Sequence, residues 1–546
     1  MGSGAMTNSI DEIYGADVIF IIGSNTNEQH PLIARRVVKA VRERGAKLIL
    51  ADPRAIGLAG LAEVFIRQKP GTDVALLNGM MHVILTEDLT DEAFIAERME
   101  AESYAALKAI LANYPPERAE EITSVPAEDI RRAARLYGKA ERATLLYAMG
   151  ITQHTTGTDN VRSIANLAML TGSVGRESTG VNPLRGQNNV QGASDMGGLP
   201  DFYPGYQRVA DEAIQTKFAQ AWGYAPPAQN GLTIPEMVNA AGKDIHALFI
   251  MAENSLLSEP DLNHVRSAIE QLDFLVVQDI FLTETAQMAD VVLPGACFAE
   301  KDGTFTNTER RVQRVRKAVE PPGQAKADWE IICALAGRLK GKDVPPSSNP
   351  DTTQWSYASP AEVMDEIAIL TPSYGGISFK RLEGRGLQWP CPSADHPGTP
   401  YLHTGQFTRG KGRFMPADYR PPAEEPDDEY PLVLTTGRVL FHYHTGTMTR
   451  RSPTLTEQIN EAFVEIHPED AAKLGLVNGH MVCVRSRRGE IALAVHVTET
   501  VPVGTVFIPF HFAEAPANLL THAALDPEAK IPEYKVCAVQ VTRING

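Results

Sequence analysis

The sequence predicts an α/β protein that holds parallel sheets in its first part and a small β-barrel at its C-terminal end. Two observations support this fold class. Apolar strand runs alternate with helical stretches from residue 17 onward, which is typical of parallel sheets covered by helices. Short strands with turn signals follow a Pro-rich, acidic linker at residues 421–428, and this pattern is typical of a barrel.

The first predicted unit is strand, helix, strand. Residues 17–23 form an apolar run that ends in Gly, and residues 47–51 form a second run that ends at Asp52. Between them Pro31 opens a helical stretch and Gly45 closes it, as the preferences of Pro and Gly for helix ends predict. This order predicts a βαβ unit.

Further strands share an apolar run that is mostly followed by polar residues. They are predicted at residues 143–148, 245–251, 274–277 and 291–293. Ligands of open α/β sheets bind beyond such carboxyl ends. The barrel strands are predicted at residues 432–434, 481–484, 491–495 and 506–508. Residues 342–360 are predicted to be a polar insertion or surface loop.

The composition is that of an ordinary globular protein with an acidic charge balance. The 546 residues include 51 Lys plus Arg and 67 Asp plus Glu, so the formal net charge is −16. At roughly 150 residues per domain, the length predicts three or four domains. The negative charge argues against nucleic acid or an anionic membrane as the main partner. The sequence contains no run of about 18 apolar residues, so no transmembrane helix is predicted.

The five cysteines stand singly along the chain, at positions 297, 333, 391, 483 and 537. No CxxC pair occurs, which argues against a zinc ribbon or an iron–sulfur cluster formed within this sequence. An odd number of unclustered cysteines fits a reducing compartment, so we expect a cytoplasmic location.

Three features favour nucleotide recognition. The turn with Gly23 and Asn25 offers backbone N–H groups to a phosphate, although it is not a GxGxxG motif. Asp52 stands at a strand end, where an acid commonly holds a ribose hydroxyl. Asp73 ends the turn at residues 70–73, and its carboxylate can accept paired hydrogen bonds from guanine. The alternative is that all three are turn residues and helix caps.

The most unusual stretch is residues 180–198, with five Gly, three Asn, two Gln and one Arg. This composition predicts neither helix nor strand. It favours an amide-rich loop around a polar ligand, in which the guanidinium of Arg185 binds a small carboxylate. The alternative is a surface loop with a solvated Arg185.

Two weaker patterns remain. His442 and His444 stand on one face of a predicted strand, as zinc ligands would, but no third ligand is near and a phosphate contact is an equal alternative. The basic run at residues 310–317 fits an anionic partner or, more commonly, a solvated face.

Five motifs carry a resemblance to a known family, at residues 4–10 (GAMTNSI), 181–192 (VNPLRGQNNVQG), 283–294, 437–448 and 532–535 (PEYK). Over nearly its whole length the chain resembles the molybdenum or tungsten bis(molybdopterin guanine dinucleotide) oxidoreductases, the DMSO reductase family. The motif at 181–192 is the most specific one, and it is similar to the catalytic (alpha) subunits of formate dehydrogenases.

The resemblance implies an α/β fold class with two parallel-sheet, dinucleotide-binding-like domains plus a C-terminal β-barrel domain. Residues 1–180 would bind one molybdopterin guanine dinucleotide (MGD), and residues 181–340 would bind the second. Residues 341–425 would be an irregular insertion and linker, and residues 426–546 would form an MGD-binding barrel.

The resemblance also implies roles for single residues. One guanosine and its phosphates would be held by Gly23, Asn25, Asp52, Arg54 and Asp73. The other half would be held by Met149, Gln153, Glu253, Asn254, Gln278 and Asp279. Pterin or pyrophosphate would meet Gln187, Arg438, His442, His444, Asn518, Tyr534 and Lys535. Arg185 would be catalytic: it would pair with the formate carboxylate and aim the C–H bond at the metal, and formate would be oxidised to carbon dioxide, a proton and two electrons.

The sequence departs from the family's pattern at the metal. Family members carry an N-terminal iron–sulfur domain and a Cys or selenocysteine ligand followed by His, whereas no Cys–His pair occurs here. We therefore expect the chain to be inactive by itself and to need that domain and electron-transfer subunits as partners. An in-frame UGA codon for selenocysteine, or a split subunit, would explain the departure.

Two other functions stay open. One is reduction of nitrate or another oxyanion within the same family, and the other is a non-catalytic structural subunit of an electron-transfer complex. Arg185, Asp73 and the amide-rich segment favour an enzyme, because a scaffold has no need for them. The motif at 181–192 favours formate.

Overall fold

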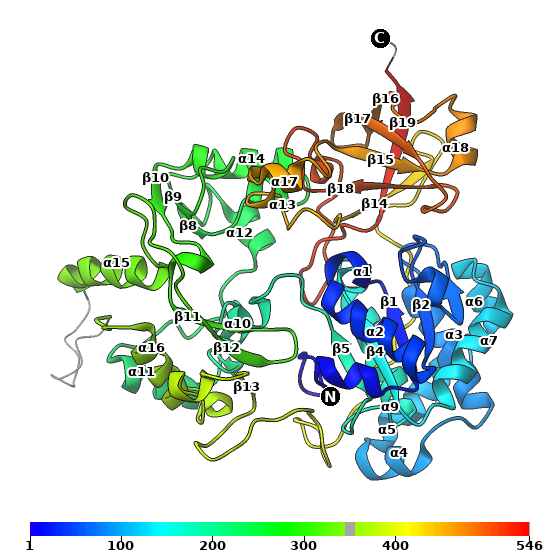
Figure 1. Cartoon of the computed structure of the whole chain (residues 1–546), viewed down its shortest axis with the longest axis horizontal. Coiled ribbons are helices and arrows are strands. Elements are labelled where there is room, and N and C mark those ends of the chain that lie inside the picture. The colour runs from blue at the N-terminus through cyan, green and yellow to red at the C-terminus, as the bar shows by residue number, and fades with distance from the viewer. Residues whose placement is uncertain (344–354, 545–546) are drawn as a thin grey trace. The chain divides into compact units, whose positions relative to one another are not determined.

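The computed structural model describes residues 1–343 and 355–544, so most of the predicted loop at 342–360 lies outside the described residues. The chain forms two compact units (Figure 1). The first comprises residues 1–186, 255–266 and 401–546, and the second comprises residues 187–254 and 267–400.

The helices of the described residues are short to medium in length. They are α1 (Thr26–Gln29), α2 (Pro31–Arg44), α3 (Asp73–Thr86), α4 (Glu92–Arg98), α5 (Ala101–Leu111), α6 (Pro116–Thr123), α7 (Ala127–Gly138), α8 (Met149–Thr152), α9 (Gly157–Leu170), α10 (Val190–Asp195), α11 (Glu212–Trp222), α12 (Ile234–Ala240), α13 (Ser255–Ser258), α14 (Leu262–Ile269), α15 (Asp328–Asp343), α16 (Pro360–Leu370), α17 (Pro453–Thr456) and α18 (Pro468–Lys473). Across the described ranges, none of them is both long and apolar enough to cross a bilayer.

A parallel sheet forms the centre of the first unit, in the order β3-β2-β1-β4-β5. Its strands are β1 (Val18–Ile22), β2 (Lys47–Ala51), β3 (Val64–Ile66), β4 (Ala143–Tyr147) and β5 (Gly180–Pro183). The predicted βαβ unit and the strand near residue 145 are confirmed. Because β1 pairs with both β2 and β4, the strand order reverses at β1.

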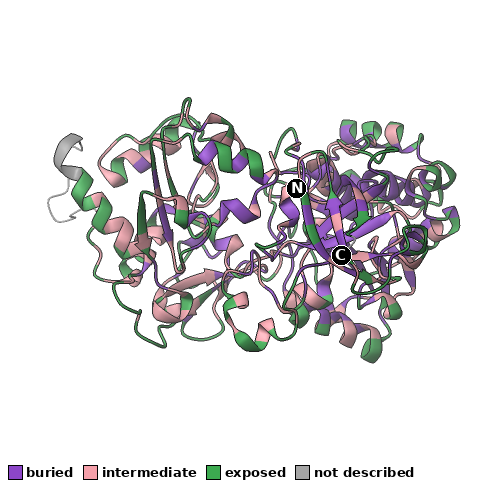
Figure 2. Cartoon of the chain, turned by 90° about the horizontal axis from the view of Figure 1, so that it is seen from above, coloured by how far each residue is buried: buried purple, intermediate pink, exposed green. Residues whose placement is uncertain are grey.

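The sheet is buried on both faces. Ile19 and Ile21 of β1 belong to the apolar layer that contains α2, whereas Phe20 belongs to the layer that contains α3, α7 and α9. Burial on both sides is typical of parallel sheets and explains the continuous apolar runs. Strands β1 and β4 are buried throughout, whereas strands of the second unit carry exposed side chains such as Phe249 and Phe274. In Figure 2 buried residues are more frequent around the labelled C-terminus, which belongs to the first unit, than at the left of the picture.

A closed barrel forms the C-terminal part of the first unit, in the order β14-β18-β15-β17-β16-β19, and confirms the predicted barrel. Its strands are β14 (Leu432–Gly437), β15 (Phe463–Ile466), β16 (Met481–Arg485), β17 (Glu490–Val497), β18 (Thr505–Pro509) and β19 (Cys537–Arg543). Val464, Val495 and Val506 are fully buried members of its core.

The second unit contains a parallel sheet, β10-β9-β8, as predicted, and two small antiparallel sheets. Their strands are β6 (Phe202–Tyr203), β7 (Gln207–Arg208), β8 (Ala247–Met251), β9 (Phe274–Asp279), β10 (Val291–Pro294), β11 (Gly303–Thr306), β12 (Arg311–Val315) and β13 (Leu387–Gln388). Arg310, between β11 and β12, is fully buried and donates hydrogen bonds to the carbonyl groups of Trp389, Thr399 and Pro400. The predicted solvated face is therefore wrong for Arg310.

The prediction of neither helix nor strand for residues 180–198 is also wrong, because the stretch contributes β5 and α10. Strand β5 lies at the edge of the sheet, where Pro183 removes no needed hydrogen bond. Gly180 has φ +112°, and a Cβ there would lie 2.2 Å from Thr7 Oγ1. Thr7 N in turn donates to Val181 O at 3.1 Å, so the N-terminal segment lines this edge.

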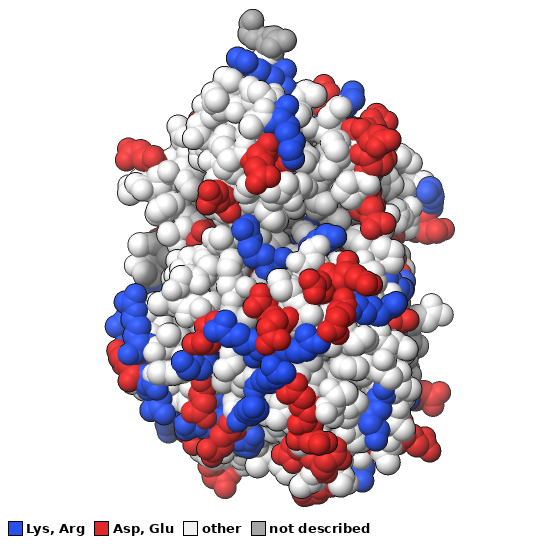
Figure 3. All heavy atoms as spheres, turned by 90° about the vertical axis from the view of Figure 1, so that its right-hand side faces the viewer, with Lys and Arg blue, Asp and Glu red and all other residues white. Residues whose placement is uncertain are grey.

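Acidic and basic side chains alternate on the face of the molecule in Figure 3 rather than gathering by sign. The first unit contains surface ion pairs of this kind, such as Arg135 with Glu87 at 2.9 Å and Arg132 with Glu63 at 2.8 Å. Such exposed pairs contribute little to stability, on the order of 0–1 kcal/mol each.

We predict that Gly180→Ala destabilises the first unit by about 3 kcal/mol, from a left-handed backbone plus the clash with Thr7. Gly45→Ala is the matched control: Gly45 also has positive φ, but no described atom lies within 4 Å of its Cβ position, so about 1 kcal/mol is expected. Scanning calorimetry measures both. All four Trp lie in the second unit, so Trp fluorescence should keep its midpoint, and equal effects of the two variants would contradict the prediction.

Candidate functional site

Two loops meet where the strand order reverses. Gly23 follows β1 and Gly150 lies beyond β4, and Gly150 N donates to Gly23 O at 3.0 Å. A Cβ on Gly150 would lie 2.6 Å from that oxygen, so a side chain has no room at this contact. In doubly wound sheets, ligands bind at the carboxyl end of the sheet beside such a reversal.

Two buried acids lie at the carboxyl edge of the same sheet. Asp52 follows β2, and its Oδ1 accepts a hydrogen bond from Arg54 N at 2.9 Å. Burial raises the pKa of Asp52 to about 6, against the opposing effect of Arg54. Asp73 begins α3, is 4% exposed and accepts a hydrogen bond from Gln68 Nε2 at 3.0 Å. Burial also raises its pKa.

Basic side chains come to this edge from the sheet and from the barrel. Arg54 pairs with Glu465 at 2.9 Å, and its guanidinium lies 3.6 Å from the centre of the Phe507 ring. Lys535 Nζ donates to Thr436 O at 2.7 Å. Burial, followed by the charge of Arg438, lowers the pKa of Lys535 to about 7.

Several basic side chains lie near Arg438, and burial and the positive charge of Arg438 lower their pKa values. Burial, followed by Arg438, lowers the pKa of His30 and of His444 to about 4. Burial is also the largest effect on His511, whose pKa falls to about 3, and Arg438 contributes again. With these pKa values the histidines are neutral at neutral pH, so the positive charge lies on Arg438 and on the protonated share of Lys535. A bound anion stabilises such partly desolvated positive charge, and guanidinium and ammonium donors suit phosphate oxygens.

Several buried polar side-chain atoms lie at the same edge of the sheet. Within residues 1–343 and 355–544, hydrogen-bond partners are lacking for both side-chain ends of Asn25, for Arg54 Nε and for Gln68 Oε1. Buried polar atoms are normally paired, so these atoms are suited to contacts with a polar ligand. A guanine dinucleotide offers the required set: base N–H groups for Asp73, and phosphate oxygens for Lys535 and the arginines.

The predicted pair of histidines on a strand face is wrong. Strand β14 ends at Gly437, and residues 438–446 form turns in which His444 has φ +50°. His442 is buried, and its Nε2 lies 2.7 Å from Ile459 O. No group of three potential metal ligands occurs in the portion of the chain that the structure describes.

Other predicted residues of the first unit make internal contacts or lie near the loops. Asn518 Nδ2 donates to Leu257 O and Ser258 O at 3.0 and 2.9 Å. Tyr534 is buried, and its carbonyl accepts from Thr436 Oγ1 at 2.8 Å. Met149 begins α8 with 38% exposure, and Gln153 is the C-cap that follows this helix.

Arg185 follows β5, and its Nη2 donates to Gly4 O at 3.0 Å. The neighbouring Tyr147 is buried; burial raises the pKa of its hydroxyl to about 12, against the charge of Arg185. Arg185 therefore lies at the same carboxyl edge of the sheet as the groups around Asp52.

The predicted residues of the second unit lie at the carboxyl end of β8 and β9. Asn254 Nδ2 donates to Glu284 Oε2 at 2.7 Å, and Gln278 Nε2 donates to Asp328 Oδ1 at 2.7 Å. Asp279 Oδ1 accepts from Ile280 N at 2.6 Å. The half-buried Glu253 precedes Asn254, and the half-buried Gln187 begins this unit. Gln278 Oε1 is buried and has no hydrogen-bond partner among the described residues.

His30, Gln68 and His511 were not predicted from the sequence. Gln68 follows β3 closely and His511 follows β18, so their position after a strand was an available signal. His30 precedes Pro31 at the start of α2, and its nearness to Arg438 requires the folded barrel.

We predict that sulfate, whose charge is constant near neutral pH, binds the first unit more weakly as pH rises through about 7. The protonated Lys535 binds the anion, and its loss of a proton should approach a tenfold change per pH unit. Isothermal titration of sulfate between about pH 6.5 and 8.5 measures this. Lys535→Gln should remove the pH step, whereas Lys530→Gln, at a half-buried lysine whose Nζ donates to Pro527 O, should keep it. An identical step in Lys535→Gln would contradict the assignment.

Comparisons with known proteins agree with this geometry. The family model "Molybdopterin oxidoreductase" matches residues 2–338, and "Molydopterin dinucleotide binding domain" matches residues 432–538. The chain is 52% identical to "F420-dependent formate dehydrogenase 1 subunit alpha" of Methanococcus maripaludis, over 100% of this chain and 79% of that protein. It is 41% identical to "Formate dehydrogenase H" of Escherichia coli, over 100% of this chain and 75% of that protein. Acetylene hydratase from Pelobacter acetylenicus has a similar fold, with TM-score 0.74 and 21% identity over 98% of this chain and 81% of that one.

Proposed function

The chain belongs to the molybdopterin oxidoreductase family, and on that premise we propose that it oxidises formate to carbon dioxide as the catalytic subunit of a formate dehydrogenase. The cofactor would be a molybdenum or tungsten bis-MGD. The observation that carries the proposal is the presence of the half-buried bases Arg438 and Lys535 near the buried acids Asp52 and Asp73. The names of the similar proteins support formate as substrate.

The residues present fit the guanine dinucleotide at the first unit. Asp73 would accept hydrogen bonds from the guanine N1–H and N2–H groups, and Asp52 would accept one from a ribose hydroxyl. Arg54, Arg438 and Lys535 would hold the phosphates. Asn254, Gln278 and Asp279 would hold the second dinucleotide in the other unit. When bound, the metal cofactor supplies the acceptor of two electrons.

Arg185 would bind and orient the substrate. Its guanidinium can donate two parallel hydrogen bonds to the formate carboxylate, which fixes the plane of the ion and the direction of its C–H bond. The side chain follows β5 directly, so the rigid sheet holds its backbone.

Partner chains are part of the proposal. The names of the first relatives describe subunits, which supports electron-transfer partners for this chain. The five cysteines are free thiols of both units, and the described residues contain no cluster of potential metal ligands. We therefore propose that a protein ligand of the metal and an iron–sulfur group come from polypeptide outside these 546 residues, so that this sequence alone does not turn over formate.

We predict that Asp73→Asn removes the preference for guanine. The carboxylate pairs with guanine but not with adenine, so the wild-type chain should bind GDP at least tenfold more tightly than ADP, and the variant should not. Calorimetric titration of both nucleotides measures the ratio. Asp91→Asn, at the N-cap of α4, is the control that should keep it. Equal affinities of the wild-type chain for GDP and ADP would contradict the site.

We predict that Arg185→Lys lowers kcat/KM for formate on the order of a hundredfold, because an ammonium group does not reproduce the paired hydrogen bonds. Formate-dependent dye reduction by the assembled holoenzyme measures this. Arg162→Lys, at a partly exposed ion pair with Glu528, should keep full activity. Nitrate reduction without formate oxidation by the wild-type holoenzyme would favour the oxyanion reductase instead.

A further inference from the structure

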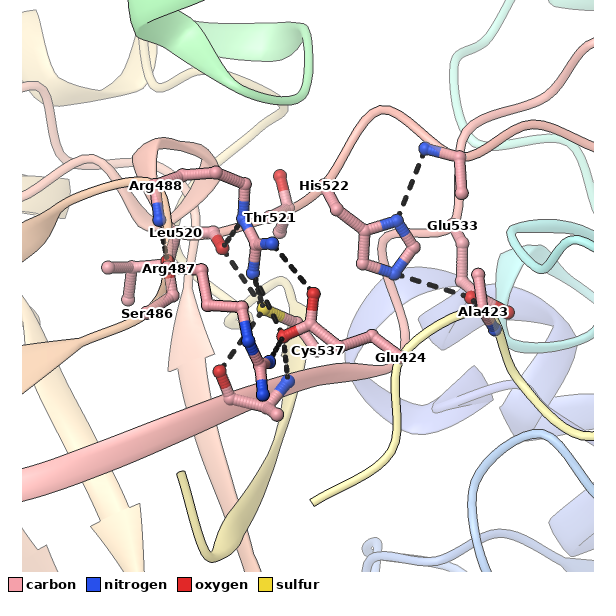
Figure 4. A network of polar contacts seen from close by, with 12 residues as sticks. Ala423, Glu424, Ser486, Arg487, Arg488, Leu520, Thr521, His522, Glu533 and Cys537 are labelled. Atoms are coloured by element: carbon pink, nitrogen blue, oxygen red, sulfur yellow. Dashed lines mark hydrogen bonds and ion pairs between the residues drawn. The ribbon is translucent and has the colours of Figure 1, made fainter. Parts of the chain in front are cut away.

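One buried carboxylate, that of Glu533, joins three distant segments of the first unit. It is 1% exposed. Its Oε1 accepts hydrogen bonds from Thr155 N at 3.1 Å and Thr155 Oγ1 at 3.2 Å, just after α8. Its Oε2 accepts from Ala423 N, in the Pro-rich linker, at 3.1 Å. Figure 4 shows Ala423 and His522 on two sides of this carboxylate.

Two histidines complete the surroundings of Glu533. His154 Nδ1 lies 3.6 Å from Oε1, and His522 Nε2 lies 3.4 Å from Oε2. Burial by itself raises the pKa of Glu533, but the close contacts with His154 and His522 and the hydrogen bond from Thr155 N outweigh it and hold the pKa below its usual range. The side chain is therefore an anion at neutral pH, with donors on both oxygens.

Both ends of this junction lead to the candidate dinucleotide site. Glu533 stands two residues before Lys535, whose ammonium group we assign to the phosphates. On the other side, His154 Nε2 lies 2.9 Å from Gly150 O, and Gly150 is in contact with Gly23 at the reversal of strand order. The carboxylate thus connects the segment that carries Lys535 with the loop that follows β4.

A second, half-buried anion, Glu424, provides a comparison (Figure 4). Glu424 pairs with Arg487 and Arg488 at 2.7 Å each, and it accepts a hydrogen bond from Ala538 N at 3.0 Å. These partners hold the same linker against the barrel. Among the described residues, the hydrogen bonds and ion pairs of Glu424 involve no residue assigned to the dinucleotide site.

We propose that Glu533 is a positioning residue of the dinucleotide site. It touches neither substrate nor phosphate, and it holds Lys535 and the loop after β4 at the spacing that the phosphates require. This inference rests on the proposed function. It adds to that function a residue that acts mainly on the phosphate half of the ligand. Asp73, which would bind the base, lies on α3 and is held by Gln68, and Glu533 reaches it only through the charge of His154.

The test compares GDP with guanosine as probes of the purified 546-residue chain. Glu533→Gln keeps the shape of the side chain and removes its charge. Both affinities are measured by calorimetric titration at a temperature where the Glu533→Gln variant is folded. The variant should bind GDP about tenfold more weakly, which is typical for loss of a supporting partner. It should bind guanosine with unchanged affinity. Glu424→Gln is the matched control: it should lower the melting temperature and leave both affinities unchanged.

Thr155→Val is the second variant, which removes one hydroxyl donor to the same carboxylate and serves if Glu533→Gln does not fold. It should weaken GDP binding about threefold and leave guanosine binding unchanged, in keeping with loss of one hydrogen bond. Equal weakening of GDP and guanosine would show general damage and overturn the inference, as would unchanged GDP binding. A wild-type chain that binds neither probe would instead overturn the proposed function, and this inference with it.

Discussion

The burial of charged side chains between the carboxyl edge of the first sheet and the barrel is the constraint on which the rest of the first unit depends. Charge removed from water is costly unless it is paired and hydrogen-bonded. Arg54 meets this requirement through Glu465 of β15 and the ring of Phe507 in β18. Arg67 does so by donating to the carbonyl groups of Pro53, Glu499 and Thr500. These contacts join sheet to barrel, and Arg438 and the protonated share of Lys535 carry the positive charge that a phosphate would balance.

Local patterns were enough to predict much of this fold. The strand at 47–51 and the helix at 31–44 have the bounds of β2 and α2, because Pro31 and Gly45 mark the helix ends and burial on both faces makes the strands uniformly apolar. Strands that carry less apolar surface were not predicted. Strands β11 (GTFT) and β12 (RVQRV) belong to a small antiparallel sheet whose side chains are mostly half-buried. Strand β5 was not predicted because its pairing with β4 and its contact with Thr7 override the low β-strand propensity of Gly, Asn and Pro.

Some residues of the candidate site could be predicted from local sequence patterns and others could not. Asp52 and Asp73 were predictable because strand ends and turns are visible in sequence. His511 and Glu533 were not, since their roles arise from partners that lie far away along the chain, such as Val439 for His511 and Thr155 for Glu533. The fully buried Arg310 shows the converse error: its sequence neighbours indicate a surface, while its three carbonyl partners lie at residues 389–400.

The distance in sequence between Asp52 and Lys535 has a consequence for biosynthesis. The acids and glycines of the first sheet leave the ribosome early, but the ammonium group that completes the phosphate side follows hundreds of residues later, and Glu533 emerges with it. Domains generally form in the order of synthesis, whereas contacts of long sequence separation form late. Tight retention of a dinucleotide at the proposed site must therefore await the synthesis of Glu533 and Lys535 and the closure of the barrel around them. Loading of the ligand and closure of the barrel are thus coupled steps of maturation.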